Sequence, residues 1–222
     1  MAKKTASSRK RILIVDDHAV LREGLIAQIN REPDLIVCGE AESARQAIVA
    51  VEKLKPDLVL ADITLPGRNG LELIRDLRTI RPGLPVLVLS MHDASFFAER
   101  VLRAGGRGYI TKQQSGQRLL QAIRQVLSGK IYLSDDVSTR LFDSLTGQRP
   151  AKTMSPVEQL TDREIEVFTL IGRAKETSDI SRQLGMSVKT VEAHRANIKR
   201  KLKLKSGPEL TRHAVLWVEA VK

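Results

Sequence analysis

Carboxylates, a hydroxyl and a lysine follow the short apolar runs in the first half of the chain. Asp16 and Asp17 follow the first run, Asp62 the third, Ser90 the fourth, and Lys112 comes just after the fifth. Because the carboxyl ends of parallel strands meet at one edge of a sheet, we expect these side chains to converge. Three converging carboxylates repel one another, and a hard divalent cation that prefers oxygen ligands relieves the repulsion. The pattern therefore predicts a Mg²⁺ site with a lysine beside it.

The expected site holds no histidine or cysteine nucleophile. A metal, a carboxylate, a lysine and a hydroxyl together favour phosphoryl chemistry, with Asp62 as the acceptor. His18 and His92 flank the site in the sequence. Because Mg²⁺ does not need imidazole ligands beside hard carboxylates, we do not expect either histidine to bind the metal.

The elements that must position these residues alternate between short apolar runs and segments of helical periodicity. Runs rich in Val, Ile and Leu are typical of parallel strands that are covered on both faces. The expected strands are Ile12–Val15, Leu35–Gly39, Leu58–Ala61, Val86–Leu89 and Gly108–Ile110, and the expected helices are Val20–Ile29, Ala44–Leu54, Leu71–Arg78, Phe97–Leu102 and Arg118–Leu127. This alternation predicts an α/β domain over residues 10–130, with a doubly wound, five-stranded parallel sheet.

The chain changes character after this domain. Residues 131–156 combine an expected helix over 135–145 with a flexible linker that contains two prolines and one glycine. Residues 157–222 are expected to form helices alone, and Thr161-x-x-Glu164 and Ser206-x-x-Glu209 are capping-box starts for two of them. Between these starts, a short helix, a turn at 185–187 and a longer basic helix predict a helix-turn-helix in a second, all-α domain.

Positive charge is concentrated in the longer basic helix. The chain carries a net charge of +11, and seven basic residues with one acid, Glu192, lie between positions 189 and 205. A cluster of this kind favours a polyanion such as double-stranded DNA as the partner. We expect Ser187 to cap the helix and four apolar residues to face the other helices: Val188, Val191, Ile198 and Leu202.

The opposite face of this helix is expected to contact DNA. Glu192 and Asn197 are expected to read base edges, while lysines and arginines approach phosphates. The whole set expected at the interface is Lys189, Thr190, Glu192, Ala193, Arg195, Ala196, Asn197, Lys199 and Arg200.

Composition excludes several classes of protein. Apolar residues make up 42% of the 222 positions and charged residues 28%, a balance that excludes disorder of the whole chain. No apolar run approaches the ~18 residues of a membrane helix, and the basic N-terminal tail leads into an expected strand rather than a signal-peptide core. The single cysteine, Cys38, excludes a disulfide within the chain. We therefore expect a cytoplasmic protein that uses neither redox chemistry nor a membrane.

Two groups of motifs share their order and spacing with a known family. The first group is Asp16-Asp17, Asp62-x-x-Leu-Pro-Gly-x-Asn-Gly70, Ser90 and Tyr109-x-x-Lys112. The second is Leu160-Thr-x-Arg-Glu164, Ser187-Val-Lys-Thr-Val191 and His194-Arg195-x-Asn197-Ile198. The first resembles the flavodoxin-like receiver domain of two-component response regulators, and the second resembles the LuxR-type DNA-binding domain. Together they resemble the NarL/FixJ-type architecture over almost the whole chain.

This resemblance implies a role for each site residue. Asp62 accepts a phosphoryl group from a histidine kinase, Asp17 and Asp62 bind Mg²⁺ directly, the carbonyl of Thr64 is another ligand, and Asp16 acts partly through water. Lys112 holds the phosphoryl oxygens. Ser90 and Tyr109 convert phosphorylation into an altered surface. The implied partners are the kinase, promoter DNA, a second copy of the phosphorylated chain and RNA polymerase.

Two alternatives remain open at the level of sequence. An aspartyl-phosphate hydrolase also uses an Asp after a strand with Mg²⁺, but it needs a second Asp two positions later, where this chain has Thr64. A protein-binding adaptor that senses phosphorylation would not bind DNA. The chain departs from the family at Ala174 and Lys203, where related sequences often have glycine. The change at Ala174 is mild, whereas at Lys203 either the helix cap differs or the backbone is strained. We expect a transcriptional regulator that does not turn over a substrate.

Overall fold

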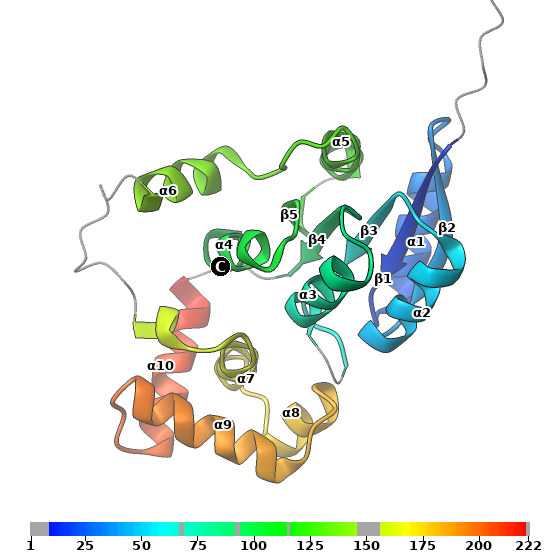
Figure 1. Cartoon of the computed structure of the whole chain (residues 1–222). Helices are drawn as coiled ribbons and strands as arrows, with labels where there is room; N and C mark the ends of the chain where they lie inside the picture. Colours follow the sequence, from blue (N-terminus) through cyan, green and yellow to red (C-terminus); the bar gives the residue numbers. More distant parts are fainter. Residues whose placement is uncertain (1–8, 67–68, 92–93, 115, 146–155, 221–222) are drawn as a thin grey trace, which may run out of the picture. The chain divides into compact units, whose positions relative to one another are not determined.

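The computed structural model describes residues 9–220 apart from 67–68, 92–93, 115 and 146–155 (Figure 1). Contacts divide the chain into two compact units, Met1–Val137 and Ser138–Lys222. Within the described residues, no helix combines the length and the apolar character needed to cross a membrane.

The first unit is built on a five-stranded parallel sheet with the strand order β2-β1-β3-β4-β5. The strands are β1 (Lys10–Val15), β2 (Leu35–Ala41), β3 (Leu58–Ala61), β4 (Val86–Ser90) and β5 (Gly108–Thr111). Each predicted strand is present, and each observed strand equals its prediction or extends it by one or two residues. The prediction of a doubly wound α/β fold is therefore confirmed.

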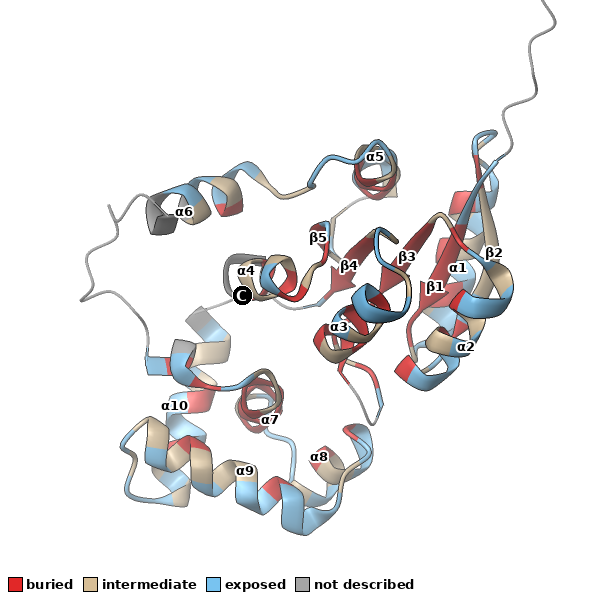
Figure 2. Ribbon diagram, in the orientation of Figure 1, coloured by how far each residue is buried: buried red, intermediate tan, exposed pale blue. Residues whose placement is uncertain are grey.

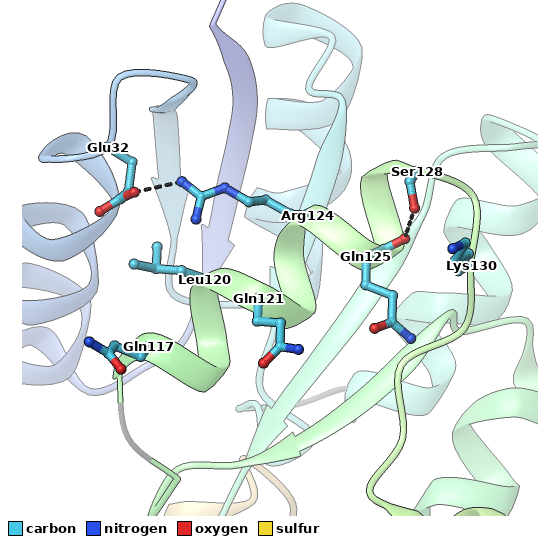
Figure 3. A pocket seen from close by; sticks show the side chains of 8 residues that line it. All are labelled: Glu32, Gln117, Leu120, Gln121, Arg124, Gln125, Ser128 and Lys130. Carbon is cyan, nitrogen blue, oxygen red and sulfur yellow. Dashed lines mark hydrogen bonds and ion pairs between the residues drawn. The ribbon is translucent and has the colours of Figure 1, made fainter.

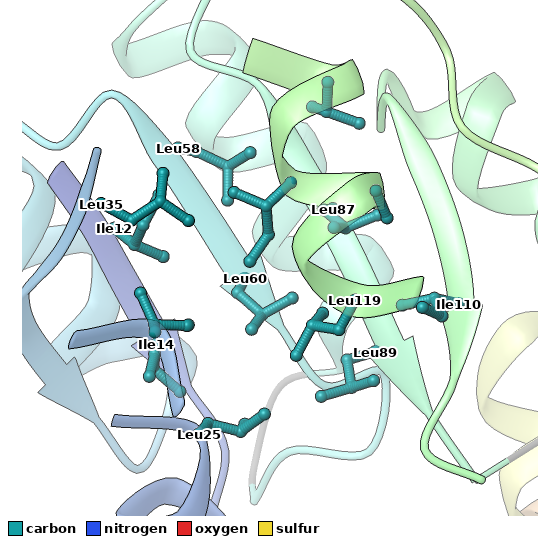
Figure 4. Close-up of a cluster of buried hydrophobic side chains, with 14 residues drawn as sticks. Ile12, Ile14, Leu25, Leu35, Leu58, Leu60, Leu87, Leu89, Ile110 and Leu119 are labelled. Atoms are coloured by element: carbon teal, nitrogen blue, oxygen red, sulfur yellow. The ribbon is translucent and has the colours of Figure 1, made fainter. Parts of the chain in front are cut away.

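Five helices connect and follow these strands: α1 (Ala19–Asn30), α2 (Ala44–Leu54), α3 (Gly70–Ile80), α4 (Ala94–Ala104) and α5 (Gly116–Leu127). On one face of the sheet, Ile12 and Ile14 of β1 pack in a buried cluster with Leu25 of α1 and Leu119 of α5 (Figure 4). The alternate position Leu13 points to the opposite face and is also fully buried. Burial on both faces, visible in Figure 2, explains why the strands are continuously apolar.

The second unit is helical throughout its described part. After α6 (Asp135–Leu145), which begins before the boundary between the units, come η2 (Pro156–Gln159), α7 (Asp162–Gly172), α8 (Thr177–Gln183), α9 (Val188–Lys201) and α10 (Gly207–Ala220). The rings of Phe168 and Trp217 lie 5.6 Å apart and join α7 to α10. This architecture confirms the predicted all-α helix-turn-helix domain. Most of the predicted linker lies outside the described residues, and Pro156 already belongs to η2.

Local sequence sets where these helices begin. The predicted capping box of α7 is complete, because Thr161 and Glu164 each accept a hydrogen bond from the other's backbone N–H. Ser187 accepts from the N–H of Thr190 at 3.1 Å and caps α9, as predicted. Before α10, Ser206 accepts from the N–H of Glu209, but the Glu209 carboxylate accepts from the N–H of Lys205 instead of that of Ser206.

In the second unit, two helices end on residues that are unusual in the left-handed conformation. Ala174 follows α7 with φ of 57°, and Lys203 follows α9 with φ of 56°. The N–H of Leu204 donates to the carbonyl of Lys199, which is the 6→1 hydrogen bond of a Schellman cap. In this motif the position held here by Lys203 is normally glycine. The helix end at Lys203 therefore keeps the usual cap. Of the two outcomes that the sequence left open, the structure has the second, a residue with a β-carbon in the unfavourable left-handed conformation.

One predicted core residue of α9 is wrong. Val191 and Ile198 are fully buried and Leu202 is half-buried, but Val188 is 51% exposed. Val188 is the first residue of α9, so its side chain lies beyond the turns that pack against α7 and α8. The start of the helix therefore presents an apolar side chain to solvent.

Candidate functional site

Two buried carboxylates lie at the carboxyl edge of the sheet. Asp16 follows β1 and is 2% exposed, and Asp62 follows β3 and is 4% exposed. The backbone of β1 and β3 aligns them, because the N–H of Asp62 donates to the carbonyl of Val15 at 2.8 Å. The two carboxylates are therefore carried by adjacent parallel strands, as the sequence predicted.

Lys112 bridges these two carboxylates. Its Nζ lies 2.6 Å from Oδ2 of Asp16 and 2.7 Å from Oδ2 of Asp62. Its backbone N–H donates to the carbonyl of Ser90 at 2.8 Å, which extends the pairing of β4 with β5 and brings the lysine to the site. The side chain is 5% exposed, so one ammonium offsets part of the negative charge of two carboxylates away from water.

The remaining acidic side chains provide oxygens for a cation. Ligand atoms of Asp16, Asp17, His18 and Asp62 all lie within 4.8 Å of one another. Oδ1 of Asp17 is buried, and although Nδ1 of His18 lies 2.9 Å from it, no hydrogen bond from a described residue reaches it. A buried carboxylate oxygen without a donor is costly unless a cation binds it. Carboxylate oxygens are also the donor type that Mg²⁺ prefers, so the residues present fit that metal.

The imidazole of His18 borders this cluster. Nδ1 lies 3.1 Å from Oδ1 of Asp16 and 2.9 Å from Oδ1 of Asp17, and the side chain is 63% exposed. His92, the other histidine near the site in the sequence, lies outside the described residues.

Burial changes the pKa of the central carboxyl. Burial raises the pKa of Asp62 from 3.8 to about 6, the charge of Asp16 acts in the same direction, and Lys112 opposes both. The N–H of Thr64 also donates to Oδ1 of Asp62 at 3.3 Å. For Lys112, burial acts to lower the pKa, but the two carboxylates outweigh it and leave the pKa above its ordinary value. At neutral pH the site therefore contains an ionised Asp62 beside a charged lysine.

The loop after Asp62 returns closely to the strand from which it leaves. Asn69 caps α3 by accepting from the N–H of Glu72 at 2.8 Å. A β-carbon added at Gly70 would lie 2.3 Å from the carbonyl oxygen of Asp62. Position 70 therefore requires glycine, because only glycine allows this close backbone approach.

Arg22 supports the site and was missed from the sequence. Its side chain is 7% exposed, and Nη1 donates to the carbonyl of Asp16 at 2.7 Å. Nε donates to Glu40 at 2.9 Å and Nη2 to Glu42 at 2.7 Å, so the guanidinium joins the end of β1 to the end of β2. Hydrogen bonding to Glu40 outweighs burial and raises the pKa of Arg22. The helical periodicity of α1 predicted a polar position here and gave no sign of a buried arginine.

The two predicted switch residues are both buried. Ser90 ends β4 with no exposed surface, and Tyr109 in β5 is 2% exposed. The backbones of β4 and β5 are paired at Ser90 and Thr111, which places Ser90 level with the residue that precedes Lys112.

In the second unit, α9 presents the predicted polar face to solvent. Lys189, Thr190, Glu192, Ala193, Ala196 and Arg200 are exposed, and Arg195, Asn197 and Lys199 are half-buried. Oδ1 of Asn197 accepts a hydrogen bond from Nη2 of Arg200 at 3.2 Å. Lys201 differs from its neighbours, because its Nζ lies 2.6 Å from Oε2 of the buried Glu164. Its charge is therefore neutralised within the domain.

A polar cavity of about 630 Å³ lies along α5, on the part of the first unit shown in Figure 3. Arg124 at this cavity pairs with Glu32 at 2.5 Å and with Asp34 at 2.7 Å. These contacts fasten α5 to the segment before β2, and none of the predicted site residues lines the cavity. We assign it a structural role.

Comparison with known proteins matches both units to families. The response regulator receiver domain matches residues 12–124, and the luxR family of bacterial regulatory proteins matches residues 158–214. The chain is a two-component response regulator with a LuxR-type DNA-binding domain. This response regulator is 38% identical over 209 residues to the oxygen regulatory protein NreC of Staphylococcus aureus, a match that covers 92% of this chain and 96% of NreC.

Solved structures of response regulators have the same fold. A LuxR-family two-component response regulator from Aurantimonas sp. SI85-9A1 is 36% identical with a TM-score of 0.59, and the match covers 63% of this chain and 99% of that one. RcsB from Salmonella enterica serovar Typhimurium, bound to promoter rprA in the presence of the phosphomimetic BeF3-, is 22% identical with a TM-score of 0.64, over 94% of this chain and 99% of that one. At that identity the second match supports the fold alone.

Proposed function

We propose that this response regulator accepts a phosphoryl group on Asp62 from a histidine kinase, and that the phosphorylated form binds promoter DNA through residues 157–222. The observation that carries the proposal is the buried Asp62 carboxylate, which shares the ammonium of Lys112 with the buried Asp16 at one edge of the sheet. We retain residues 10–130 as the phosphoacceptor domain and 131–156 as the connection between the domains.

The proposed reaction is a transfer between two nucleophiles. An oxygen of Asp62 attacks the phosphorus of a phosphohistidine, a phosphorus–oxygen bond forms, and the phosphorus–nitrogen bond breaks with its electron pair left on the imidazole. The ammonium of Lys112, now 2.7 Å from Asp62, then binds an oxygen of the transferred group. Asp16, Asp17, Asp62 and the carbonyl of Thr64 would hold Mg²⁺, which neutralises charge on the phosphoryl oxygens.

The proposed donor reaches Asp62 from one side of the site. A cavity of about 670 Å³ is lined by His18, Lys112 and residues of α1 and α5. Val20 and Met91 at this cavity are 84% and 55% exposed. An exposed apolar rim beside a polar centre suits a protein donor better than a small free phosphate.

The phosphorylated state is proposed to differ at Ser90 and Tyr109. The Ser90 hydroxyl would donate to the new phosphoryl oxygen, and Tyr109 would reorient with it, which alters the surface of α4 and β5. We propose that this altered surface favours a homodimer, because one domain of ~65 residues offers too small an interface for useful specificity on DNA. RNA polymerase is a further proposed partner, and all these partners place the protein in the cytoplasm.

The proposed DNA interface is the exposed face of α9. Lys189, Lys199 and Arg200 would bind phosphates, and Glu192 and Asn197 would contact base edges. The exposed Val188 is well placed for apolar contact with a thymine methyl group, and we add it to the interface that the sequence predicted.

Phosphoryl labelling tests the acceptor. The full chain is incubated with acetyl phosphate and Mg²⁺, and intact-mass spectrometry is followed by borohydride reduction to locate the acyl phosphate. Wild type is expected to gain one phosphoryl group at Asp62, and Asp62→Asn none. Asp57→Asn is the matched control, because Asp57 lies at the opposite end of β3. Full incorporation into Asp62→Asn would disprove the assignment.

A further inference from the structure

A hydroxyl on one helix of the helix-turn-helix holds a carboxylate on the next. Thr177 is the first residue of α8, and its Oγ1 donates to Oε1 of Glu192 in α9 at 3.0 Å. Nε of Arg195, three residues further along α9, lies 3.6 Å from the same oxygen. The Glu192 side chain is 57% exposed, so it faces solvent although one of its oxygens is held. Among the described residues, no hydrogen bond engages Oε2 of Glu192.

Two contacts from different helices restrict a side chain that is otherwise free to move. A glutamate on a helix surface has several accessible rotamers, and fixing it costs conformational entropy. Here the conformational entropy of the Glu192 side chain is lost before DNA binds, because Thr177 and Arg195 contact the same carboxylate oxygen in the free protein. The second oxygen is left at a defined position on the exposed face of α9. Recognition of one base edge depends on this kind of preorganisation.

We propose that Thr177 and Arg195 are positioning residues that set the base specificity of Glu192, which presents Oε2 as a single fixed acceptor to the exocyclic amine of a cytosine. This inference rests on the proposed function, in which α9 lies in the major groove. Where cytosine has its exocyclic amine, guanine and thymine present an acceptor oxygen to the major groove, and that oxygen repels a carboxylate. Adenine offers an amine beside the acceptor N7, so cytosine suits the carboxylate best.

The proposal changes the role of Arg195. From the sequence, Arg195 was expected among the residues at the DNA interface. Its side chain is 21% exposed and its Nε lies 3.6 Å from Oε1 of Glu192, so in this proposal it acts on DNA through the carboxylate. Thr177, by contrast, was not among the predicted interface residues, because α8 carries no basic cluster and a threonine at a helix start is an ordinary capping residue.

Selection from a library of random duplexes tests the proposal with the full, phosphorylated chain. Wild type is expected to select a motif with cytosine at one position of each half-site. Thr177→Val keeps the shape of the side chain and removes the hydroxyl, so preference at that position alone is expected to fall roughly threefold to tenfold. Thr177→Ser retains a hydroxyl and is expected to retain the preference. Affinity for non-specific DNA is expected to stay unchanged in both variants.

A double variant separates positioning from simple loss of stability. If Thr177 acts only through Glu192, Thr177→Val is expected to change nothing further in a Glu192→Ala background. The inference would be overturned if Thr177→Val selected the same motif as wild type, or if it weakened the preference equally at every position of the motif. Either result would leave the proposed function in place. Absence of any motif with phosphorylated wild type would contradict the proposed function itself.

Discussion

At the scale of single residues, the chemistry of the site depends on how deeply Asp62 is buried. Sequence alone predicted which residues meet at the sheet edge, because each follows an apolar run and parallel strands align their carboxyl ends. It did not predict that Lys112 bridges Asp16 and Asp62, or that Arg22 is buried behind Asp16. Those facts depend on side-chain directions and on distant partners such as Glu40, which periodicity does not encode.

The first prediction concerns the titration of Asp62. In the absence of divalent metal, one aspartate carboxyl is expected to titrate near pH 6, because burial raises the pKa of Asp62 to about 6. The folded chain then binds this proton more tightly than the unfolded chain. The resulting stabilisation is complete below pH 3.8 and is lost as the pH rises through about 6.

Carbon-detected NMR of the chain with labelled aspartate carboxyls, in the presence of a chelator, measures this titration. The signal is expected to be missing in Asp62→Asn. Lys112→Met is expected to move the midpoint to higher pH, since Lys112 opposes the effect of burial. Lys130→Met, which changes an exposed lysine of the same unit, is the control. A midpoint at the ordinary aspartate value would show that burial does not govern this carboxyl.

At the scale of helices, local sequence set most boundaries and packing set the exceptions. Short apolar runs located every strand, and capping residues such as Thr161 and Ser187 marked helix starts. Periodicity assigned Val188 to the core, but Val188 is the first residue of α9 and is exposed, whereas Val191 in the same turn is buried. Sequence also left open whether the end at Lys203 is strained, because that depends on the backbone conformation.

A substitution at the end of α7 tests the strain. Ala174→Gly is expected to stabilise the second unit by about 1 kcal/mol, because the left-handed conformation is unfavourable for a residue with a β-carbon. Trp217 is the single tryptophan of the chain, so its fluorescence during thermal unfolding reports on this unit. Ala193→Gly, at an exposed position inside α9, is expected to destabilise by a similar amount. Equal effects of the two substitutions would contradict the explanation.

Neighbouring lysines of α9 are expected to differ in their contribution to DNA binding. Lys199→Ala is expected to reduce the slope of log affinity against log salt concentration by about one. With one phosphate contact fewer, binding releases fewer counterions from the DNA. Lys201→Gln is expected to leave the slope unchanged, because Lys201 is paired with Glu164. Burial acts to raise the pKa of Glu164, but hydrogen bonds from Lys201 and Thr161 outweigh it and leave that pKa below its ordinary value.

For the stability of the second unit, we expect the substitution of Lys201 to have the larger effect and that of Lys199 the smaller. Lys201→Gln leaves a buried carboxylate with a weaker partner and is expected to destabilise the second unit by about 2 kcal/mol, whereas Lys199→Ala is expected to have little effect. DNA titrations over a range of salt, with thermal unfolding of the same variants, measure both quantities. Equal salt slopes for the two variants would show that Lys201 also contacts phosphate.

At the scale of the whole molecule, charge and chemistry are divided between the two units. The acidic site lies in the first unit, and the cluster of seven basic residues lies in α9 and the turn after it. Each unit matches its own family, and along the chain the receiver domain precedes the LuxR-type DNA-binding domain. Sequence sufficed for this organisation because each motif set lies within one of the two units.

The central claim is that phosphorylation of Asp62 controls binding to DNA. Its most direct test is one titration of the selected duplex with wild type and Asp62→Asn, each before and after treatment with acetyl phosphate and Mg²⁺. Treatment is expected to increase the affinity of wild type at least tenfold, which corresponds to about 1.4 kcal/mol, and to leave Asp62→Asn unchanged. An equal response of both proteins, or an unchanged affinity of fully phosphorylated wild type, would contradict the claim.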